Sequence, residues 1–252
     1  MAAQVKYQGT TAWVNYTLNS TALNGNDQIR ILEGNLGSIY AFNGNDTVYG
    51  SSGADDINGG VGNDYLTGEA GNDRLYGESG ADSIYGGDGN DSIVGGDGAD
   101  QLFGQGGMDT IYGGIGNDTL NGGQGGDRLD GDGGNDLFIF ENLTTGWDLA
   151  YDNSGDDRYR FDGSAKAEIF DATGNDLLIF SNVNFSSLDA IQVGDDIWVS
   201  SAQNIANAVA SGMTLSANSI SNGAWIHDGM TTGRIETVQG FDMTGSIDLL
   251  LM

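Results

Sequence analysis

The sequence has no cysteine and no proline, and it has eight basic residues (Lys and Arg) against 36 acidic ones. Without cysteine no disulfide is possible, so a protein outside the cell would need another stabilising element, and bound metal can serve. The formal net charge of −28 excludes nucleic acid as a partner and argues against binding to an anionic membrane surface, because both attract basic residues.

Catalytic motifs and membrane-crossing segments are also missing. His227 is the single histidine, which excludes the His-Glu-x-x-His motif of zinc proteases, and there is neither a Gly-x-Ser-x-Gly motif nor a cysteine nucleophile. No apolar run reaches the roughly 18 residues that a membrane span requires. The first ten residues lack the basic and apolar regions of a secretory signal peptide. We therefore expect a protein that is not an enzyme and is not inserted in a membrane.

Residues 41–139 consist of 11 consecutive nine-residue units without an insertion. The pattern is Gly-Gly-x-Gly-x-Asp-x-U-x, where U is a large apolar residue. Asp and Gly are common in ordinary turns, but turns alone do not explain aspartate at position 6 of all 11 units. A phosphate-binding glycine loop would need a cation where these loops carry carboxylates. Position 8, which we expect to face inward from a short strand, is occupied by Val48, Ile57, Leu66, Leu75, Ile84, Ile93, Leu102, Ile111, Leu120, Leu129 and Phe138.

This repeat resembles that of the RTX, or haemolysin-type calcium-binding, family. The resemblance implies an all-β fold, a right-handed parallel β-roll, in which each unit forms a loop at positions 1–6 and a strand at positions 7–9. Two units make one turn of the coil, so every second unit stacks at about 4.8 Å. The position-6 aspartates then form a first column (Asp46, Asp64, Asp82, Asp100, Asp118 and Asp136) and a second column (Asp55, Asp73, Asp91, Asp109 and Asp127).

Carboxylates stacked at this distance repel each other unless a divalent cation lies between them. Carboxylate and carbonyl oxygens suit Ca²⁺, whereas Mg²⁺ loses its water too reluctantly for such a cage. The columns have 5 + 4 = 9 gaps, and Asp27 with Asp46 would add a tenth, so we expect about nine to ten Ca²⁺ ions. The resemblance implies that each ion takes two aspartates and carbonyls of positions 1–4, as in the complete copies with Gly59, Gly60 and Gly62, Gly86, Gly87 and Gly89, Gly95, Gly96 and Gly98, and Gly113, Gly114 and Gly116.

The segment before the repeats is less regular. Residues 1–21 are β-rich and predict a hairpin or separate strands that cover the first coil. The step from Asp27 to Asp46 is one residue longer than two repeat units, so one residue, for which we choose Ile31, should bulge from the first coil. Gly37 stands where aspartate is expected, which predicts a coil without a metal at that point.

The period breaks after residue 139, where three loose copies surround Asp157, Asp176 and Asp196. Each of these aspartates follows the one before it by more than two repeat units, which predicts wider coils with longer strands, and we expect no further ions there. The hydrophobic pattern of this part predicts short helices at residues 187–193 and 202–213 and strands at residues 224–226 and 234–238.

These observations divide the chain into three expected parts: an N-terminal β cap (1–21), the calcium-binding β-roll (22–139) and a β-rich C-terminal region for capping and secretion (140–252). The last residues, 248–252, resemble the acidic-then-apolar tail of type I secretion substrates, and an ordinary final strand explains them equally well.

Aromatic side chains recur at position 9, which faces outward. Two explanations remain open, a contact surface for another molecule or stacking with neighbours along the sheet. These residues are Tyr40, Tyr76 and Tyr112 on one sheet and Tyr49, Tyr85 and Phe103 on the other.

The pattern as a whole predicts a secreted or cell-surface calcium-binding structural protein. It would leave the cell unfolded through a type I secretion apparatus, fold when Ca²⁺ binds outside, and self-associate into a surface layer, matrix filament or adhesin. One alternative is a non-catalytic module of a secreted protease, lipase or polysaccharide epimerase, which the short segment before the repeats, 1–21, disfavours. Another is a calcium-dependent carbohydrate binder that uses the Trp and Tyr residues of 140–252.

Overall fold

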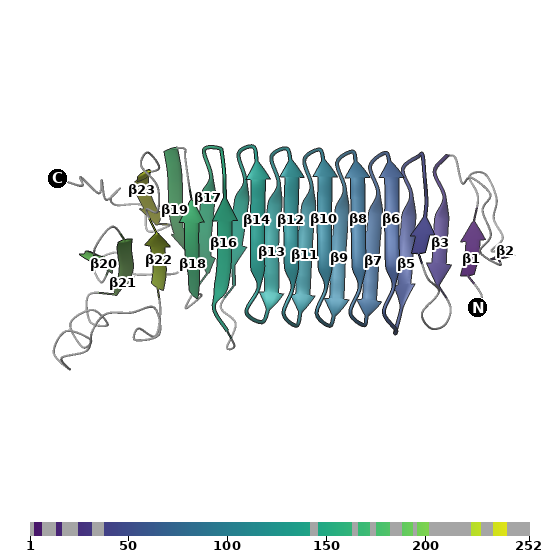
Figure 1. Cartoon of the computed structure of the whole chain (residues 1–252), viewed down its shortest axis with the longest axis horizontal. Helices are drawn as coiled ribbons and strands as arrows, with labels where there is room; N and C mark the ends of the chain where they lie inside the picture. The colour runs from purple at the N-terminus through teal and green to yellow at the C-terminus, as the bar shows by residue number, and fades with distance from the viewer. Residues whose placement is uncertain are drawn as a thin grey trace.

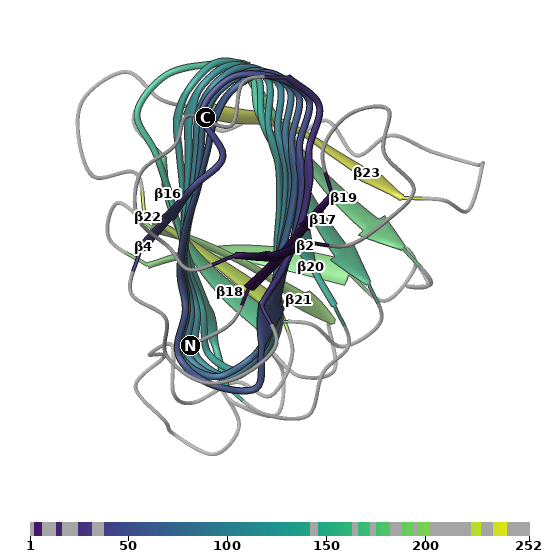
Figure 2. The ribbon, with the colours of Figure 1, turned by 90° about the vertical axis from the view of Figure 1, so that its right-hand side faces the viewer.

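Two long β-sheets face each other along the whole molecule. The computed structural model describes residues 3–6, 14–16, 25–31, 38–141, 146–162, 166–171, 175–181, 188–193, 196–201, 223–227 and 234–240. These residues form 23 strands, of which 12 lie in one sheet and 11 in the other. The strands stack side by side into an elongated solenoid (Figure 1) whose cross-section is a flattened oval (Figure 2).

In the repeat region, consecutive strands alternate between the sheets, and strands two units apart pair in parallel: Leu66 lies beside Ile84, and Ile84 beside Leu102. The predicted parallel β-roll with two units per turn is therefore confirmed. The 12-stranded sheet contains β5 (Thr47–Ser51), β7 (Tyr65–Ala70), β9 (Ser83–Asp88), β11 (Gln101–Gly106), β13 (Thr119–Gln124) and β15 (Leu137–Phe140), and the 11-stranded sheet contains β4 (Ser38–Tyr40), β6 (Asp56–Val61), β8 (Arg74–Ser79), β10 (Ser92–Asp97), β12 (Thr110–Ile115) and β14 (Arg128–Gly133).

The strands are longer than the sequence predicted. Most run for six residues, from position 7 of one unit through position 3 of the next, so the loop has only positions 4–6. Positions 2 and 3 extend the ladder because their backbone stays in register with the next turn, as in the pairs Gly96↔Gly114 and Asp97↔Ile115. The predicted loop over positions 1–6 was wrong, since glycine gives no side-chain pattern from which backbone pairing can be inferred.

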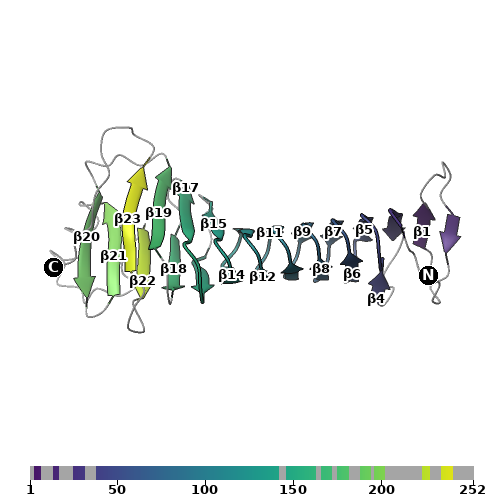
Figure 3. The same ribbon diagram turned by 90° about the horizontal axis from the view of Figure 1, so that it is seen from above.

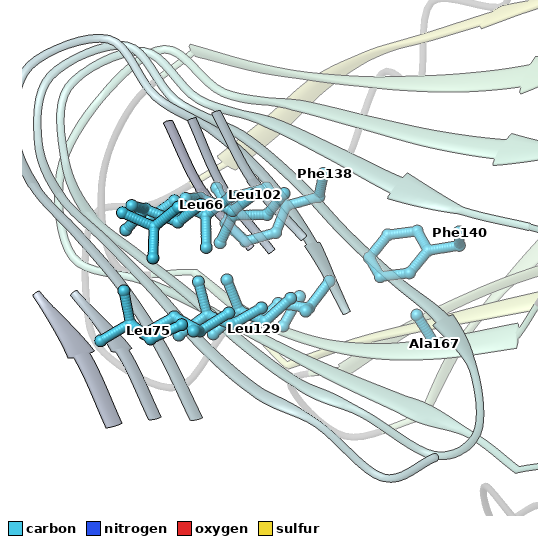
Figure 4. Close-up of a cluster of buried hydrophobic side chains, with 14 of the residues drawn as sticks. Leu66, Leu75, Leu102, Leu129, Phe138, Phe140 and Ala167 are labelled. Carbon is cyan, nitrogen blue, oxygen red and sulfur yellow. The ribbon is translucent and has the colours of Figure 1, made fainter. Parts of the chain in front are cut away.

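The core is a narrow double row of side chains between the sheets. All 11 position-8 residues have an exposed fraction of 0%, as predicted. Figure 4 shows Leu66 and Leu102 from one sheet above Leu75 and Leu129 from the other. Towards the C-terminal end the core becomes aromatic, where Phe138 stacks on Tyr159 with ring centroids 4.9 Å apart.

The N-terminal end extends the 12-stranded sheet by antiparallel pairing. β1 (Ala3–Lys6) pairs antiparallel with both β2 (Val14–Tyr16) and β3 (Gln28–Ile31), so the predicted hairpin is present. The predicted bulge at Ile31 was wrong, because Ile31 closes β3 as a regular strand residue, 3% exposed and paired with Ala3. Gly37 lies outside the described residues.

The parallel sheets continue past residue 139 in strands of five to seven residues, so the prediction of longer strands is confirmed for residues 175–181 and was wrong for residues 148–152, 158–162 and 166–171. They contain β16 (Asp148–Asp152), β17 (Arg158–Asp162), β18 (Lys166–Asp171) and β19 (Asn175–Ser181), which are followed by β22 (Gly223–His227) and β23 (Arg234–Gly240). The strands predicted at 224–226 and 234–238 are thus confirmed. The division of the chain at residues 21 and 139 stays a prediction.

The loose copy around Asp196 does not form a coil, and the helix predicted at 187–193 was wrong. β20 (Leu188–Val193) and β21 (Asp196–Ser201) form an antiparallel pair in which Val193 lies opposite Asp196. Their sequence signal was the short connection Gly-Asp, which favours a hairpin over a helix. Figure 3 shows these strands at the broad C-terminal end of the solenoid. The helix predicted at 202–213 and the tail 248–252 lie outside the described residues.

Candidate metal columns

Tight turns between consecutive strands form the two narrow edges of the oval (Figure 2), and the position-6 aspartates lie in these turns, directly before the strands. Asp64 lies between β6 and β7, and Asp73 lies between β7 and β8, so the first and second columns occupy opposite edges. All members of both columns, and Asp27 before them, are at most 4% exposed. The structure therefore brings together both predicted columns, each along one edge of the roll.

A ladder of backbone hydrogen bonds fixes one oxygen of each carboxylate. The N–H of Asp64 donates to Oδ1 of Asp82 at 2.7 Å, and the N–H of Asp73 donates to Oδ1 of Asp91 at 2.8 Å. The backbone carbonyl of each aspartate accepts from the next turn as well, as that of Asp46 does from the N–H of Tyr65 at 2.8 Å. Each bond links an aspartate to the turn that follows it, so the ladder has a direction.

Asp55 is the first aspartate of the second column, because Gly37 stands at position 6 of the unit before it in that column. Within its own unit, the N–H and the hydroxyl of Ser51 donate to Oδ2 of Asp55 at 2.7 and 3.0 Å. The first column begins earlier, because the N–H of Asp27 donates to Oδ1 of Asp46. Asp27 is thus aligned with that column, as a tenth site would require.

The second carboxylate oxygen points at position 1 of its own unit. A Cβ built on Gly95 would lie 2.4 Å from Oδ2 of Asp100 and 2.6 Å from the carbonyl oxygen of Gly113. Within the described part of the chain, one oxygen of each of the 11 column aspartates is buried without a hydrogen-bond partner. Buried oxygens that lack a donor, placed beside a backbone carbonyl, fit a hard cation such as Ca²⁺.

The predicted ligand glycines play different structural roles. Position 1, as at Gly59, excludes a side chain because Oδ2 of Asp64 would lie 2.4 Å from its Cβ. Positions 2 and 4 adopt left-handed backbone, with φ of 108° at Gly60 and 136° at Gly62. The same holds for Gly87, Gly89, Gly96, Gly98, Gly114 and Gly116. Carbonyl ligation by these residues stays a prediction.

Burial raises the pKa of the column carboxyls, because desolvation disfavours the charged form. The pKa is raised to about 7 at Asp73, Asp82 and Asp109, and to about 6 at Asp46. The hydrogen bond from the preceding turn opposes this shift, while the charges of the neighbouring aspartates add to it. Near neutral pH these sites therefore hold either protons or cations.

Two sets of residues escaped the sequence analysis. At position 5, asparagine Oδ1 accepts the N–H one turn later, as Asn63 does from Ala81 at 3.0 Å. The second column also continues to Asp148, whose Oδ1 accepts the N–H of Asp127 at 3.0 Å. Gly146-Trp147-Asp148 kept the repeat signal, but its inward position holds Ala150 in place of a large apolar residue.

The first column continues through the two loose copies that the sequence placed in coils. The N–H of Asp136 donates to Oδ1 of Asp157 at 2.7 Å, and that of Asp157 donates to Oδ1 of Asp176 at 2.8 Å. Asp157 and Asp176 are at most 2% exposed. The carboxylate ladder therefore survives insertions that change the spacing between turns.

A scan against family models matches four copies of the RTX calcium-binding nonapeptide repeat, at residues 40–75, 67–102, 76–111 and 103–138. Among solved structures, the chain is similar to the extracellular lipase LipA from Serratia marcescens, with 19% identity and a TM-score of 0.25. The similarity covers 75% of this chain and 38% of that one. The search of curated proteins gave no match.

No helix of the described residues is long and apolar enough to span a membrane. RTX repeats bind Ca²⁺, and the family match covers the same residues that form the stacked turns and buried columns. The repeat region of this chain belongs to the RTX calcium-binding nonapeptide repeat family.

Proposed function

We propose that this protein is a secreted, calcium-binding structural protein whose roll folds when Ca²⁺ fills the columns. The observation that carries the proposal is the set of 11 buried carboxylates, each with one oxygen that accepts no hydrogen bond in the described structure. Burying an ionised carboxylate without a partner costs several kcal/mol. A cation in each gap removes this cost, so ion binding and folding are coupled.

A calcium titration followed by far-ultraviolet circular dichroism tests the coupling. We expect a disordered spectrum at about pH 7.5 in excess chelator and a β spectrum at millimolar Ca²⁺, with Mg²⁺ at the same concentration much less effective. A β spectrum of equal strength in chelator would refute calcium-dependent folding.

The proposed location is extracellular, with export through a type I secretion apparatus. RTX repeat proteins are typically secreted. Extracellular calcium modules work at about 10⁻⁴ to 10⁻³ M, so columns of this kind would stay empty inside a cell and fill outside it. The chain would then pass the exporter unfolded. Fusion to a reporter, with and without residues 140–252, in cells that carry a type I exporter would test this route.

We propose in addition that the folded roll self-associates through its outer aromatic strip, defined as Tyr49, Tyr65, Tyr85 and Phe103. Successive ring centroids are 6.1, 5.3 and 4.9 Å apart along the 12-stranded sheet. Tyr85 and Phe103 are stacked, as one of the two explanations predicted, whereas both contacts of Tyr65, a position-7 residue, are tilted. Tyr65 remains 39% exposed. A continuous, partly exposed strip of this kind is suited to contact with a second copy.

Sedimentation of the calcium-loaded protein tests self-association. Tyr65→Ser should shift the protein towards the monomer, whereas Tyr76→Ser, on the outer face of the other sheet, should leave the association unchanged. A wild-type protein that stays monomeric at high concentration would count against the assembly role.

A structural role also accounts for the chemistry of the repeat region. Apart from Ser51 and Asn121, its buried polar residues are aspartates, most of them held by the backbone in a repeated geometry, and the sequence has one histidine and no cysteine. We therefore propose that the chain itself is not a catalyst. Assays of the calcium-loaded protein on peptide, ester and polysaccharide substrates would test this. Reproducible turnover that persists in every variant of the column aspartates would indicate a separate active site.

A further inference from the structure

The regular roll ends at a unit that breaks one rule of the repeat. Residues 152–160 read Asp-Asn-Ser-Gly-Asp-Asp-Arg-Tyr-Arg, with the position-6 residue Asp157 already placed in the first column. Position 1 of this unit is Asp152, where the ten units from Gly50 to Ile139 all have glycine. Asp152 is 3% exposed, so its carboxylate lies inside the roll.

Asp152 joins two column aspartates. Asp136, Asp152 and Asp157 each offer a carboxylate oxygen, and these oxygens all lie within 4.8 Å of one another. A Cβ built on Gly131 would lie 2.3 Å from Oδ2 of Asp152 and 2.5 Å from Oδ2 of Asp136. The side chains of Asp152 and Asp136 therefore meet beside Gly131. In a regular turn, the same place is occupied by one aspartate oxygen and one backbone carbonyl oxygen.

The charge of this cluster requires a counter-charge. Asp136 is 1% exposed, and its carboxyl group is hydrogen-bonded to the side chain of Asp152. Two ionised carboxylates cannot hydrogen-bond to each other, so their close approach needs a shared proton or a cation. Arg128 and Arg160, in neighbouring strands, are already paired with Asp130 and Asp162 at 2.8 and 3.0 Å.

We propose that Asp136, Asp152 and Asp157 form a three-carboxylate Ca²⁺ site, the junction site, that binds more tightly than the regular two-aspartate gaps. A third carboxylate raises the ligand charge from −2 to −3, and calcium affinity rises with ligand charge. Asp152 ends β16 in one sheet, while Asp136 and Asp157 precede β15 and β17 in the other. The ion would thus join the two sheets where the roll changes its core.

The test compares two variants that lose the same charge by the same substitution. Asp152→Gly restores the repeat's own residue at position 1, so the fold should tolerate it. Asp132→Gly, at the exposed position 2 of the preceding unit, is the control. Bound calcium in the full chain is counted by elemental mass spectrometry after dialysis against chelator-buffered Ca²⁺, while circular dichroism reports the fold.

We expect the tightest ion of the wild type to bind at least about tenfold more weakly in Asp152→Gly and to be unchanged in Asp132→Gly. Equal binding curves for the two variants would show that the cluster shares a proton and would overturn the junction site. If Asp152→Gly does not fold, Asp152→Asn decides by the same comparison. The inference rests on the proposed function, whose own failure would appear differently, as a wild type that binds no calcium.

Discussion

Two regions of the molecule enclose a core between the same two sheets: the regular roll, residues 41–139, and the coils that follow it, residues 146–181. They differ in the length of their turns and in the size of their core residues. The roll keeps a constant turn of two units and a thin core of Leu, Ile and Val up to Phe138, whereas the later coils add residues to the loops and place Tyr159 and Phe161 in the core. The aspartate ladder runs through both. The ladder therefore depends on the register of positions 6–8 and not on loop length.

This comparison also shows which parts of a turn are constrained. In the ten units from Gly50 to Ile139, position 1 has no space for a side chain, because carboxylate and carbonyl oxygens fill it, whereas the first unit has Ala41 there. In the later coils Asp152 occupies the same position with a carboxylate of its own. Loop length and core volume can vary between coils, while the aspartate and its backbone donor recur in both regions.

The largest expected effect is that of pH on the calcium-free roll. The pKa values of about 6–7 in the folded protein lie above the ordinary aspartate value of 3.8. The folded state therefore binds more protons than the unfolded state. The stabilisation that the protonated column carboxyls provide is present below about pH 4 and is lost as the pH rises through about 6–7. In chelator, the β signal in circular dichroism should grow as the pH falls from about 8 to about 4. A signal that is flat over this range, in samples cleared by centrifugation, would contradict the buried columns.

The second prediction compares the loss of stability when an aspartate is replaced in the middle of a column with the loss when one is replaced at its end. Asp82→Asn should destabilise the calcium-loaded roll by roughly 3–5 kcal/mol, because it weakens two buried gaps with stacked turns on both sides. Asp176→Asn, at the last aspartate found in the first column, should cost less. Asp97→Asn, an exposed acid at position 3, is the control. Thermal unfolding at fixed free calcium measures the three variants, and equal losses for Asp82 and Asp97 would exclude a special role for position 6.

The third effect concerns position 1. Gly95→Ala should destabilise the roll by about 1–3 kcal/mol, because its Cβ would overlap Oδ2 of Asp100 and the carbonyl oxygen of Gly113. Asp152→Ala should leave the calcium-free fold closer to the wild type, since that turn already holds a side chain. Denaturant unfolding in chelator at about pH 4, where bound calcium does not contribute to stability, compares them. Equal tolerance at both positions would mean that the two regions do not differ at position 1.

The smallest effect is stabilising. Glu69 adopts left-handed backbone with φ of 74°, a conformation that glycine reaches without a Cβ clash. Glu69→Gly should therefore stabilise the roll by up to about 1 kcal/mol. Asp88→Gly, an exposed acid outside the left-handed region at position 3, removes the same charge without this relief. Unfolding midpoints that rise equally would assign the gain to charge and not to backbone strain.

Much of this fold could be predicted because two kinds of side chain repeat. The apolar position 8 gave the inward face, and the aspartate at position 6 gave the register of the columns. Strand length could not be predicted, because positions 1–3 pair through the backbone and their residues, such as Gly68, Glu69 and Asp97, show no alternation of apolar and polar side chains. The strand β20 was mistaken for a helix because Leu188 and Ile191, three residues apart, fit a helical spacing as well.

The candidate sites divide in the same way. Column aspartates such as Asp64 were found because their spacing is constant over 11 units. Asp148 was missed because Ala150 stands where the pattern demands a larger residue, and Asp152 because an acid at position 1 violates the glycine rule. The residues that escaped prediction are thus those at which the chain departs from its own repeat.

The one-way orientation of the aspartate ladder has a consequence for building longer rods. Because every amide points to the following carboxylate, a block of two units such as 77–94 can be duplicated inside the stack and each new acid will meet a ready donor. The first aspartate of the second stack, Asp55, is held differently, because it accepts hydrogen bonds from Ser51 of its own unit. A rod can therefore be lengthened by duplicating internal units, whereas the first unit of a new rod needs its own hydrogen-bond donors to its aspartate.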